Sequence, residues 1–148
     1  MRNRTGFTVV EMLVVVTVGA ILLSITMNSL ANFRTRTSVR QARDVFLSFH
    51  ARTRAQAVEF GQNTELNIDS GGDSIWISRN DTTLSVVNMQ TQLGVDIEGS
   101  GVHTLCMTAR GFADSSCNSF GQSTLTVRFI QGPRTVTISV LPLGQALY

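Results

Sequence analysis

Glu11 is the residue of this chain whose surroundings most constrain its chemistry. It is the only charged residue between Phe7 and Phe33, in a run otherwise made of apolar and small polar side chains. A carboxylate near the centre of a lipid bilayer costs about 2.5–3.5 kcal/mol on insertion scales, so such a group usually has a partner and a function. We therefore expect Glu11 to pair with a positive charge.

The other titratable residues do not form a catalytic or metal-binding pattern. We expect His50 to be a solvated residue on the flank of a helix, and His103 to be an ordinary structural residue of a strand. Asp69, Asp73 and Asp81 surround a glycine turn. They lack the alternating spacing of a calcium loop, and turn formation explains them better. The sequence thus predicts a protein that is not an enzyme and carries no metal or cofactor.

Cys106 and Cys117 are the only two cysteines. An even number of cysteines in an exported domain favours a disulfide, here one that closes a short loop. The chain-entropy model gives such a loop a stabilisation on the order of 2–3 kcal/mol. The alternative is a pair of metal ligands, but two cysteines without accompanying histidines make a poor zinc site.

The charges of the chain are balanced outside its first few residues. Arg2 and Arg4 precede Gly6, and the rest of the chain has ten arginines, no lysine and ten acidic residues. Net charge therefore gives no reason to expect an acidic partner.

A long helix should position Glu11. From Met12 to Phe33 there are 22 residues without a charge, and a helix of that length spans about 33 Å, enough to cross a bilayer. Gly61 is a natural C-terminal stop. Before it, the residues on one face recur at steps of three and four, as in an amphipathic helix: Val39, Ala42, Phe46, Phe49, Thr53, Ala57 and Phe60.

After Gly61 the pattern changes to alternation with period two, which is typical of strands. The predicted strands are Thr64–Ile68, Ser74–Ser78, Thr82–Val87, Val95–Ile97 and a hairpin of Thr124–Ile130 with Thr135–Val140. In the hairpin, one set of alternate residues should face the core: Leu125, Val127, Phe129, Val136, Ile138 and Val140.

Four arginines follow one flank of the helical stripe: Arg36, Arg40, Arg43 and Arg54. Clustered positive charge can bind the phosphates of DNA or lipid. Arginine stems can equally cover the apolar stripe while their charged ends reach water. The strand region has no groove of mixed aromatic and basic residues, and DNA binding is the less favoured interpretation.

The start of the chain, Gly6-Phe7-Thr8-Val9-Val10-Glu11, resembles the class III signal of type IV prepilins. The resemblance implies that a prepilin peptidase cuts after Gly6 and that the new amine of Phe7 is methylated. It also implies that Glu11 neutralises the N-terminal amine of a neighbouring subunit during filament assembly. A plain signal anchor or a Sec signal peptide is the alternative, but a Sec signal has a shorter apolar region and its cut lies after that region.

Later segments are similar to the FimT/GspH family of minor pilins and pseudopilins. They are Phe49–Val58 with its Ala51-Arg52 pair, Arg110-Gly111-Phe112, and Val140-Leu141-Pro142-Leu143-Gly144. Two residues depart from the family pattern. Many relatives have a proline where this chain has Asn28, and many have an arginine where it has Gln145. A local break of the helix near Asn28 is therefore in doubt.

The resemblance implies the α+β pilin fold, in which a long N-terminal helix with a transmembrane first half packs on a C-terminal antiparallel β-sheet domain. The expected segments are a leader (residues 1–6), a transmembrane and filament-core helix (7–33), its amphipathic continuation (34–61) and a periplasmic or extracellular β domain (62–148). The implied function is that of a structural subunit of a type IV pilus or of a type II secretion pseudopilus. Its partners would be other pilins, the prepilin peptidase and inner-membrane lipid.

The implied location is the bacterial inner membrane, with a single crossing and a periplasmic C-terminal domain. Arg34, Arg36, Arg40 and Arg43 outnumber the two arginines before Gly6, which by the positive-inside rule would favour the opposite orientation. The prepilin-like signal and the cysteine pair favour export. Two alternatives stay open: a minor pilin that captures DNA, and a membrane-anchored periplasmic domain that never polymerises.

Overall fold

The computed structural model describes residues 8–148, apart from the side chains of residues 25–29, 31 and 32. The predicted cleavage and methylation residues, Gly6 and Phe7, lie outside the described residues. The chain divides into two compact units, Met1–Arg34 and Thr35–Tyr148.

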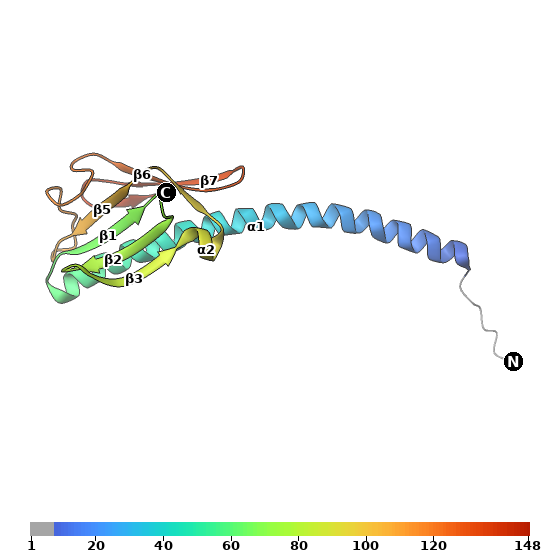
Figure 1. Ribbon diagram of the computed structural model, residues 1–148, viewed down its shortest axis with the longest axis horizontal. Coiled ribbons are helices and arrows are strands. Elements are labelled where there is room, and N and C mark those ends of the chain that lie inside the picture. Colours follow the sequence, from blue (N-terminus) through green and yellow to red (C-terminus); the bar gives the residue numbers. More distant parts are fainter. Residues whose placement is uncertain (1–7) are drawn as a thin grey trace. The chain divides into compact units, whose positions relative to one another are not determined.

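The main helix, α1, runs from Val9 to Phe60 and ends where Gly61 takes a left-handed conformation (φ 63°) (Figure 1). The predicted stop at Gly61 is confirmed. The backbone is helical at Asn28, so the helix is not broken there. Within the described residues, no helix is both long and apolar enough to cross a membrane. The predicted membrane segment, residues 7–33, is not confirmed and stays a prediction.

The second unit contains two antiparallel four-stranded sheets (Figure 1). The first sheet has the order β3-β2-β1-β5 and the second has the order β4-β6-β7-β8. The strands of the first sheet are β1 (Thr64–Asp69), β2 (Ser74–Arg79), β3 (Thr82–Asn88) and β5 (Val102–Met107). Those of the second are β4 (Asp96–Glu98), β6 (Leu125–Gln131), β7 (Arg134–Val140) and β8 (Ala146–Leu147). A short helix, α2 (Met89–Leu93), leads from β3 toward β4.

Turn chemistry sets the two tight hairpins. Asn80 and Asp81 join β2 to β3 with φ values of 48° and 62°, the pair of positive angles that a type I′ turn requires. Gly132 joins β6 to β7 with φ 56° at the first central position, where a II′ turn needs glycine. These turns match the right-handed twist of the strands that they connect.

A single core lies between α1 and the two sheets. Phe46 is fully buried on α1, and its ring centroid lies 5.9 Å from that of Phe129 on β6. The same core includes residues from both sheets, among them Leu66 and Ile75 of the first and Ile138 of the second. Burying apolar area at about 25 cal/mol per Å² is the main force that holds these layers together.

Most sequence-based expectations for this unit are confirmed. Five of the seven stripe residues are buried on α1, namely Val39, Ala42, Phe46, Thr53 and Ala57. All the strands that were predicted exist, with ends shifted by at most one residue. The sequence patterns missed α2 and β8 as elements and placed a strand at His103, in β5, without giving its bounds.

One stripe residue departs from the expectation. Phe60 is 51% exposed, because the helix ends there, and the guanidinium of Arg79 lies 4.0 Å from its ring centroid. The prediction that Phe60 belongs to the buried stripe is therefore wrong.

Candidate assembly site

Glu11 lies in the first turn of α1 and forms a capping box with Thr8. The backbone N–H of Glu11 donates to Oγ1 of Thr8 at 3.2 Å, and the backbone N–H of Thr8 donates to Oε2 of Glu11 at 3.4 Å. This reciprocal arrangement satisfies two backbone donors that a helix start otherwise leaves unpaired. The carboxylate also lies at the positive end of the helix dipole. The geometry holds a negative charge at the beginning of the helix.

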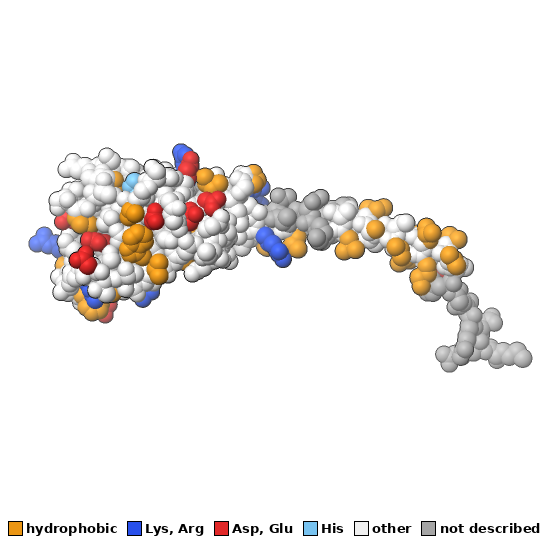
Figure 2. Space-filling model, in the orientation of Figure 1, with side chains coloured by type: hydrophobic (Ala, Val, Ile, Leu, Met, Phe, Trp, Pro, Cys, Tyr) orange, Lys and Arg blue, Asp and Glu red, His pale blue; other side chains and the backbone are white. Residues whose placement is uncertain are grey.

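The helix around Glu11 presents an apolar surface on all sides. The following residues of this unit are each at least half exposed: Val9, Val10, Met12, Leu13, Val14, Val15, Val16, Val18, Ile21 and Leu23. Figure 2 shows these hydrophobic side chains along the helix. Exposed apolar area of this extent marks a surface that another protein or lipid covers.

The four arginines that were predicted as possible phosphate contacts do not share one environment. Arg36 and Arg40 are exposed on α1. Arg43 makes an ion pair with Asp44 at 2.9 Å, and Arg54 lies over the ring of Phe112 at 5.9 Å from its centroid.

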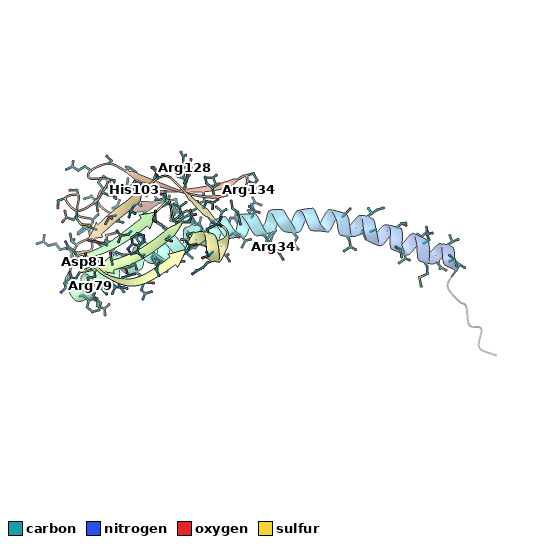
Figure 3. All side chains as sticks on the ribbon, in the orientation of Figure 1. Arg34, Arg79, Asp81, His103, Arg128 and Arg134 are labelled. Carbon is teal, nitrogen blue, oxygen red and sulfur yellow. A yellow bond between two sulfur atoms is a disulfide. The ribbon has the colours of Figure 1, made fainter. Side chains whose placement is uncertain are left out.

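Basic residues of the strands are also dispersed. Figure 3 shows Arg79 and Asp81 at one end of the domain and Arg134 at the other. Arg128 on β6 pairs with Glu98 at 3.1 Å. Because positive charge is not gathered into a groove on the described part of the domain, the arrangement gives little support to DNA binding.

His50 is not the solvated residue that its position in the sequence suggested. It is 8% exposed, its ring stacks on that of Phe46 with centroids 6.5 Å apart, and its Nε2 lies 2.8 Å from the carbonyl oxygen of Gly144. Burial lowers the pKa of His50, the hydrogen bond to Gly144 raises it, and the positive charge of Arg54 lowers it further. The correction has a simple cause. His50 is four residues after Phe46 and three before Thr53, so it falls on the buried stripe itself.

His103 lies on β5 opposite Ile68 and is partly exposed, as a structural strand residue should be. The three aspartates near the glycine turn do not converge on one site. Oδ1 of Asp69 accepts the backbone N–H of Gly71 at 2.9 Å, and Oδ1 of Asp73 accepts the backbone N–H of Ile97 at 2.6 Å. These two are turn and loop aspartates, in line with the expectation.

Cys106 and Cys117 form the predicted disulfide, with Cα atoms 5.8 Å apart. Glu65 lies within reach of both sulfur atoms. The disulfide leaves no thiolate there to act as a ligand, so this group is not a metal site. The disulfide closes the loop that runs from the end of β5 to Cys117.

That loop covers the outer edge of β5. The N–H of Thr104 donates to Oγ of Ser119 at 2.9 Å, and its carbonyl accepts the N–H of Ser119 at 3.0 Å. The N–H of Cys106 donates to Oδ1 of Asn118 at 2.8 Å, and its carbonyl accepts the N–H of Asp114 at 2.9 Å. The backbone groups of both strand residues are thereby satisfied on the side that faces away from β1.

The chain is similar to known proteins in its first residues and in its fold. Residues 1–27 match the family model described as the prokaryotic N-terminal methylation motif. The chain is similar to the crystal structure of the type IV minor pilin FimU from Pseudomonas aeruginosa strain PAO1, with a TM-score of 0.58. The alignment covers 78% of this chain and 90% of that chain at 13% identity. The fold is that of a type IV pilin. No curated protein sequence matches the chain.

On this pilin fold, the disulfide that the sequence predicted is present, but two relationships were not predicted: the capping box and the cover over β5. The capping box has a local sequence signal, Thr8-Val9-Val10-Glu11, in which a threonine is followed three residues later by a glutamate. The cover over β5 had no such local signal, because its partners are far apart along the chain.

Proposed function

We propose that this chain is a structural minor pilin or pseudopilin. In this proposal a prepilin peptidase cuts after Gly6, the amine of Phe7 is methylated, and the mature chain assembles with other pilins into a filament. The observation that carries the proposal is a methylation motif that leads into a capped apolar helix on a pilin fold. The domain of residues 35–148 supplies no catalytic arrangement among its described residues, and its role is contact with neighbouring subunits.

Glu11 is the residue on which assembly depends in this proposal. After the cut, the new amine on Phe7 is a positive charge four residues before Glu11, at the same end of the helix. When subunits pack side by side, the carboxylate of one helix neutralises the amine of its neighbour. Opposite charges attract strongly once water is removed, so the pair both stabilises the contact and sets the axial register of the helices.

Membrane anchorage belongs to the same proposal. The apolar surface from Val9 to Leu23 is suited to lipid before assembly and to the helices of other pilins afterwards. We place the domain of residues 35–148 on the periplasmic side, because its disulfide requires an oxidising compartment. This orientation is opposite to the one that the flanking arginines favour. Determining the side of the membrane on which the domain lies therefore tests the proposal directly.

The finer assignment to the FimT/GspH family is part of the proposal and rests on the sequence landmarks around Ala51-Arg52 and Val140–Gly144. A type IV pilus and a type II secretion pseudopilus are the two filaments that fit. Detecting the chain in sheared surface pili would select the first, and loss of protein secretion without loss of pili on deletion would select the second.

The deciding experiment is mass spectrometry of the N-terminus of the chain extracted from membranes, in cells with and without the prepilin peptidase. The proposal expects a chain that begins at methylated Phe7 only when the peptidase is present. A chain that still begins at Met1 in the presence of the peptidase would overturn it, and would favour a membrane-anchored domain that does not polymerise.

A further inference from the structure

The outer edge of β3 is open, unlike the other three sheet edges of the domain. In the first sheet β3 and β5 are the two edge strands (Figure 1), and in the second sheet they are β4 and β8. An edge strand carries a row of backbone N–H and C=O groups that can pair with another chain, and soluble proteins usually protect such rows. The four edges of this domain differ in how they are protected.

Three of the edges are protected in recognisable ways. The disulfide-closed loop satisfies both the N–H and the C=O of Thr104 and Cys106 on β5. Strand β4 has three residues, two of them acidic, and the N–H of its central residue Ile97 donates to Oδ1 of Asp73. Strand β8 has only two residues. Short length, charge and a covering loop are the usual devices against unwanted strand pairing.

Strand β3 has none of these devices. It is seven residues long, with the sequence Thr-Thr-Leu-Ser-Val-Val-Asn, and carries no charge and no proline. Within residues 8–148, Thr82–Val87 form no hydrogen bond outside the pairing with β2. Thr82, Thr83 and Val86 are exposed, the last at 63%. Uncharged β-branched sequence on an open edge has the composition that pairs most readily with another strand.

The backbone of another extended segment can pair with the whole row, because its donors and acceptors alternate at the spacing of a strand. Because β3 carries no charge, a charged side chain opposite it would have no ion-pair partner there, and an uncharged strand is the better fit.

The symmetry of the contact decides between a second β3 and a different strand. Antiparallel pairing of β3 with β3 of another copy is a two-fold contact, which closes on itself as a dimer. Subunits that enter a filament from one membrane all point the same way, and a growing filament needs contacts between different surfaces. The geometry therefore favours a strand that is not β3 itself.

We propose that the β3 edge, Thr82–Val87, is a docking site for an extended, uncharged strand of the adjoining subunit in the filament, which extends the first sheet from four strands to five. The inference rests on the proposed function, because the occupant is a neighbour in the filament. It adds a contact on the outer domain to the packing of the helices.

The test places a photo-crosslinking amino acid at Val86 or at Val102 in the full chain, in cells that assemble the filament. Both valines are exposed on edge strands of the same sheet, at 63% and 49%, but the edge of β5 is already occupied by the loop at the neighbouring Thr104 and Cys106. Crosslinks from position 86 to a neighbouring subunit, and few or none from position 102, are expected.

Variants test whether the contact matters. Val86→Lys puts a charge on the open edge, and the incoming strand would have to remove water from it. We expect the amount of chain in the filament fraction to fall about tenfold or more, while Val102→Lys leaves it unchanged. Thr83→Lys is the second variant on the same edge, in case Val86→Lys lowers the thermal stability of the purified full-length chain in detergent.

Two negative results are distinguishable. If the unaltered chain is absent from every filament fraction, the proposed function and this inference both fail. If the unaltered chain is incorporated, but both lysine variants are incorporated equally well and position 86 gives no crosslink to a neighbour, the inference alone is overturned.

Discussion

The imidazole of His50 and the carbonyl of Gly144 are joined by a buried hydrogen bond of 2.8 Å. The carbonyl can only accept, so Nε2 of His50 carries the proton and donates it. This bond connects α1 to the turn between β7 and β8. The two bonded residues, His50 and Gly144, are 94 residues apart along the chain. It fixes the last turn of the fold against the helix.

Acidification should destabilise the domain through His50. Burial lowers the pKa of His50 below its ordinary value near 6.5, so the unfolded chain takes up the proton at a higher pH than the folded chain does. The stability that the neutral ring contributes is complete above pH 6.5 and is lost as the pH falls toward the lowered pKa. Chemical unfolding between pH 8 and 5 should show the free energy of unfolding decreasing below about pH 6.5.

The matched variants are His50→Gln and His103→Gln. Glutamine at position 50 does not titrate, so the decrease between pH 6.5 and 5 should become shallower, whereas the variant at the partly exposed position 103 should retain it. An identical pH profile for the native chain and His50→Gln would show that another group is responsible.

Gly144→Ala should destabilise the domain more than an ordinary glycine replacement. Gly144 has φ 84°, and a Cβ there would lie 2.9 Å from Cβ of Ala113. Gly121, with φ 56° and no atom within 4 Å of such a Cβ, is the control that has the backbone strain alone. We expect a loss of about 1–2 kcal/mol for Gly121→Ala and about 2–5 kcal/mol for Gly144→Ala, measured by urea unfolding. Equal losses would mean that the turn can move away from Ala113.

Removal of the disulfide should cost about 3 kcal/mol, the loop-closure value for a short loop. Cys106 is fully buried and Cys117 is exposed, so the suitable double variant is Cys106→Ala with Cys117→Ser. Its urea midpoint should drop, and reduction of the native chain by dithiothreitol should produce a comparable drop. If neither treatment changes the midpoint, the hydrogen bonds of Ser119, Asn118 and Asp114 hold the loop without help.

Gly6→Leu should block processing, because a bulky side chain replaces the small residue before the expected cut. Intact mass measurement should find the variant with its leader, and Asn3→Leu, which adds a bulky residue within the leader, should be cut normally. A product of mature size from Gly6→Leu would show that the junction lies elsewhere.

Substitution of Glu11 should separate its charge from its cap. Glu11→Ala removes both, and we expect export and cleavage to remain largely intact while incorporation into the filament falls by about tenfold or more. Glu11→Gln keeps a side chain that can complete the capping box with Thr8 but removes the charge. It should be equally defective in the filament fraction. Normal co-assembly of Glu11→Gln would refute the role of the charge.

The sequence by itself determined the features that depend on neighbouring residues. The place of Glu11 in an apolar run, the end of α1 at Gly61, the β6–β7 hairpin and the pairing of the only two cysteines are all readable locally. Hydrophobic period, turn residues and cysteine number are properties of short segments, and the structure confirms the elements they predict. The roles of Gly6, Phe7 and Glu11 in processing and assembly stay predictions.

Only the tertiary structure decided the partners of buried polar groups and which edges are free. The spacing of His50 places it on the buried stripe, but its hydrogen-bond partner Gly144 is 94 residues away, and β5 is satisfied because residues 114–119 fold back over it. The strands divide into two sheets, and β3 keeps an open edge, through pairings between segments far apart along the chain. Hydrogen-bond partners and edge protection depend on such distant contacts, which no local pattern contains.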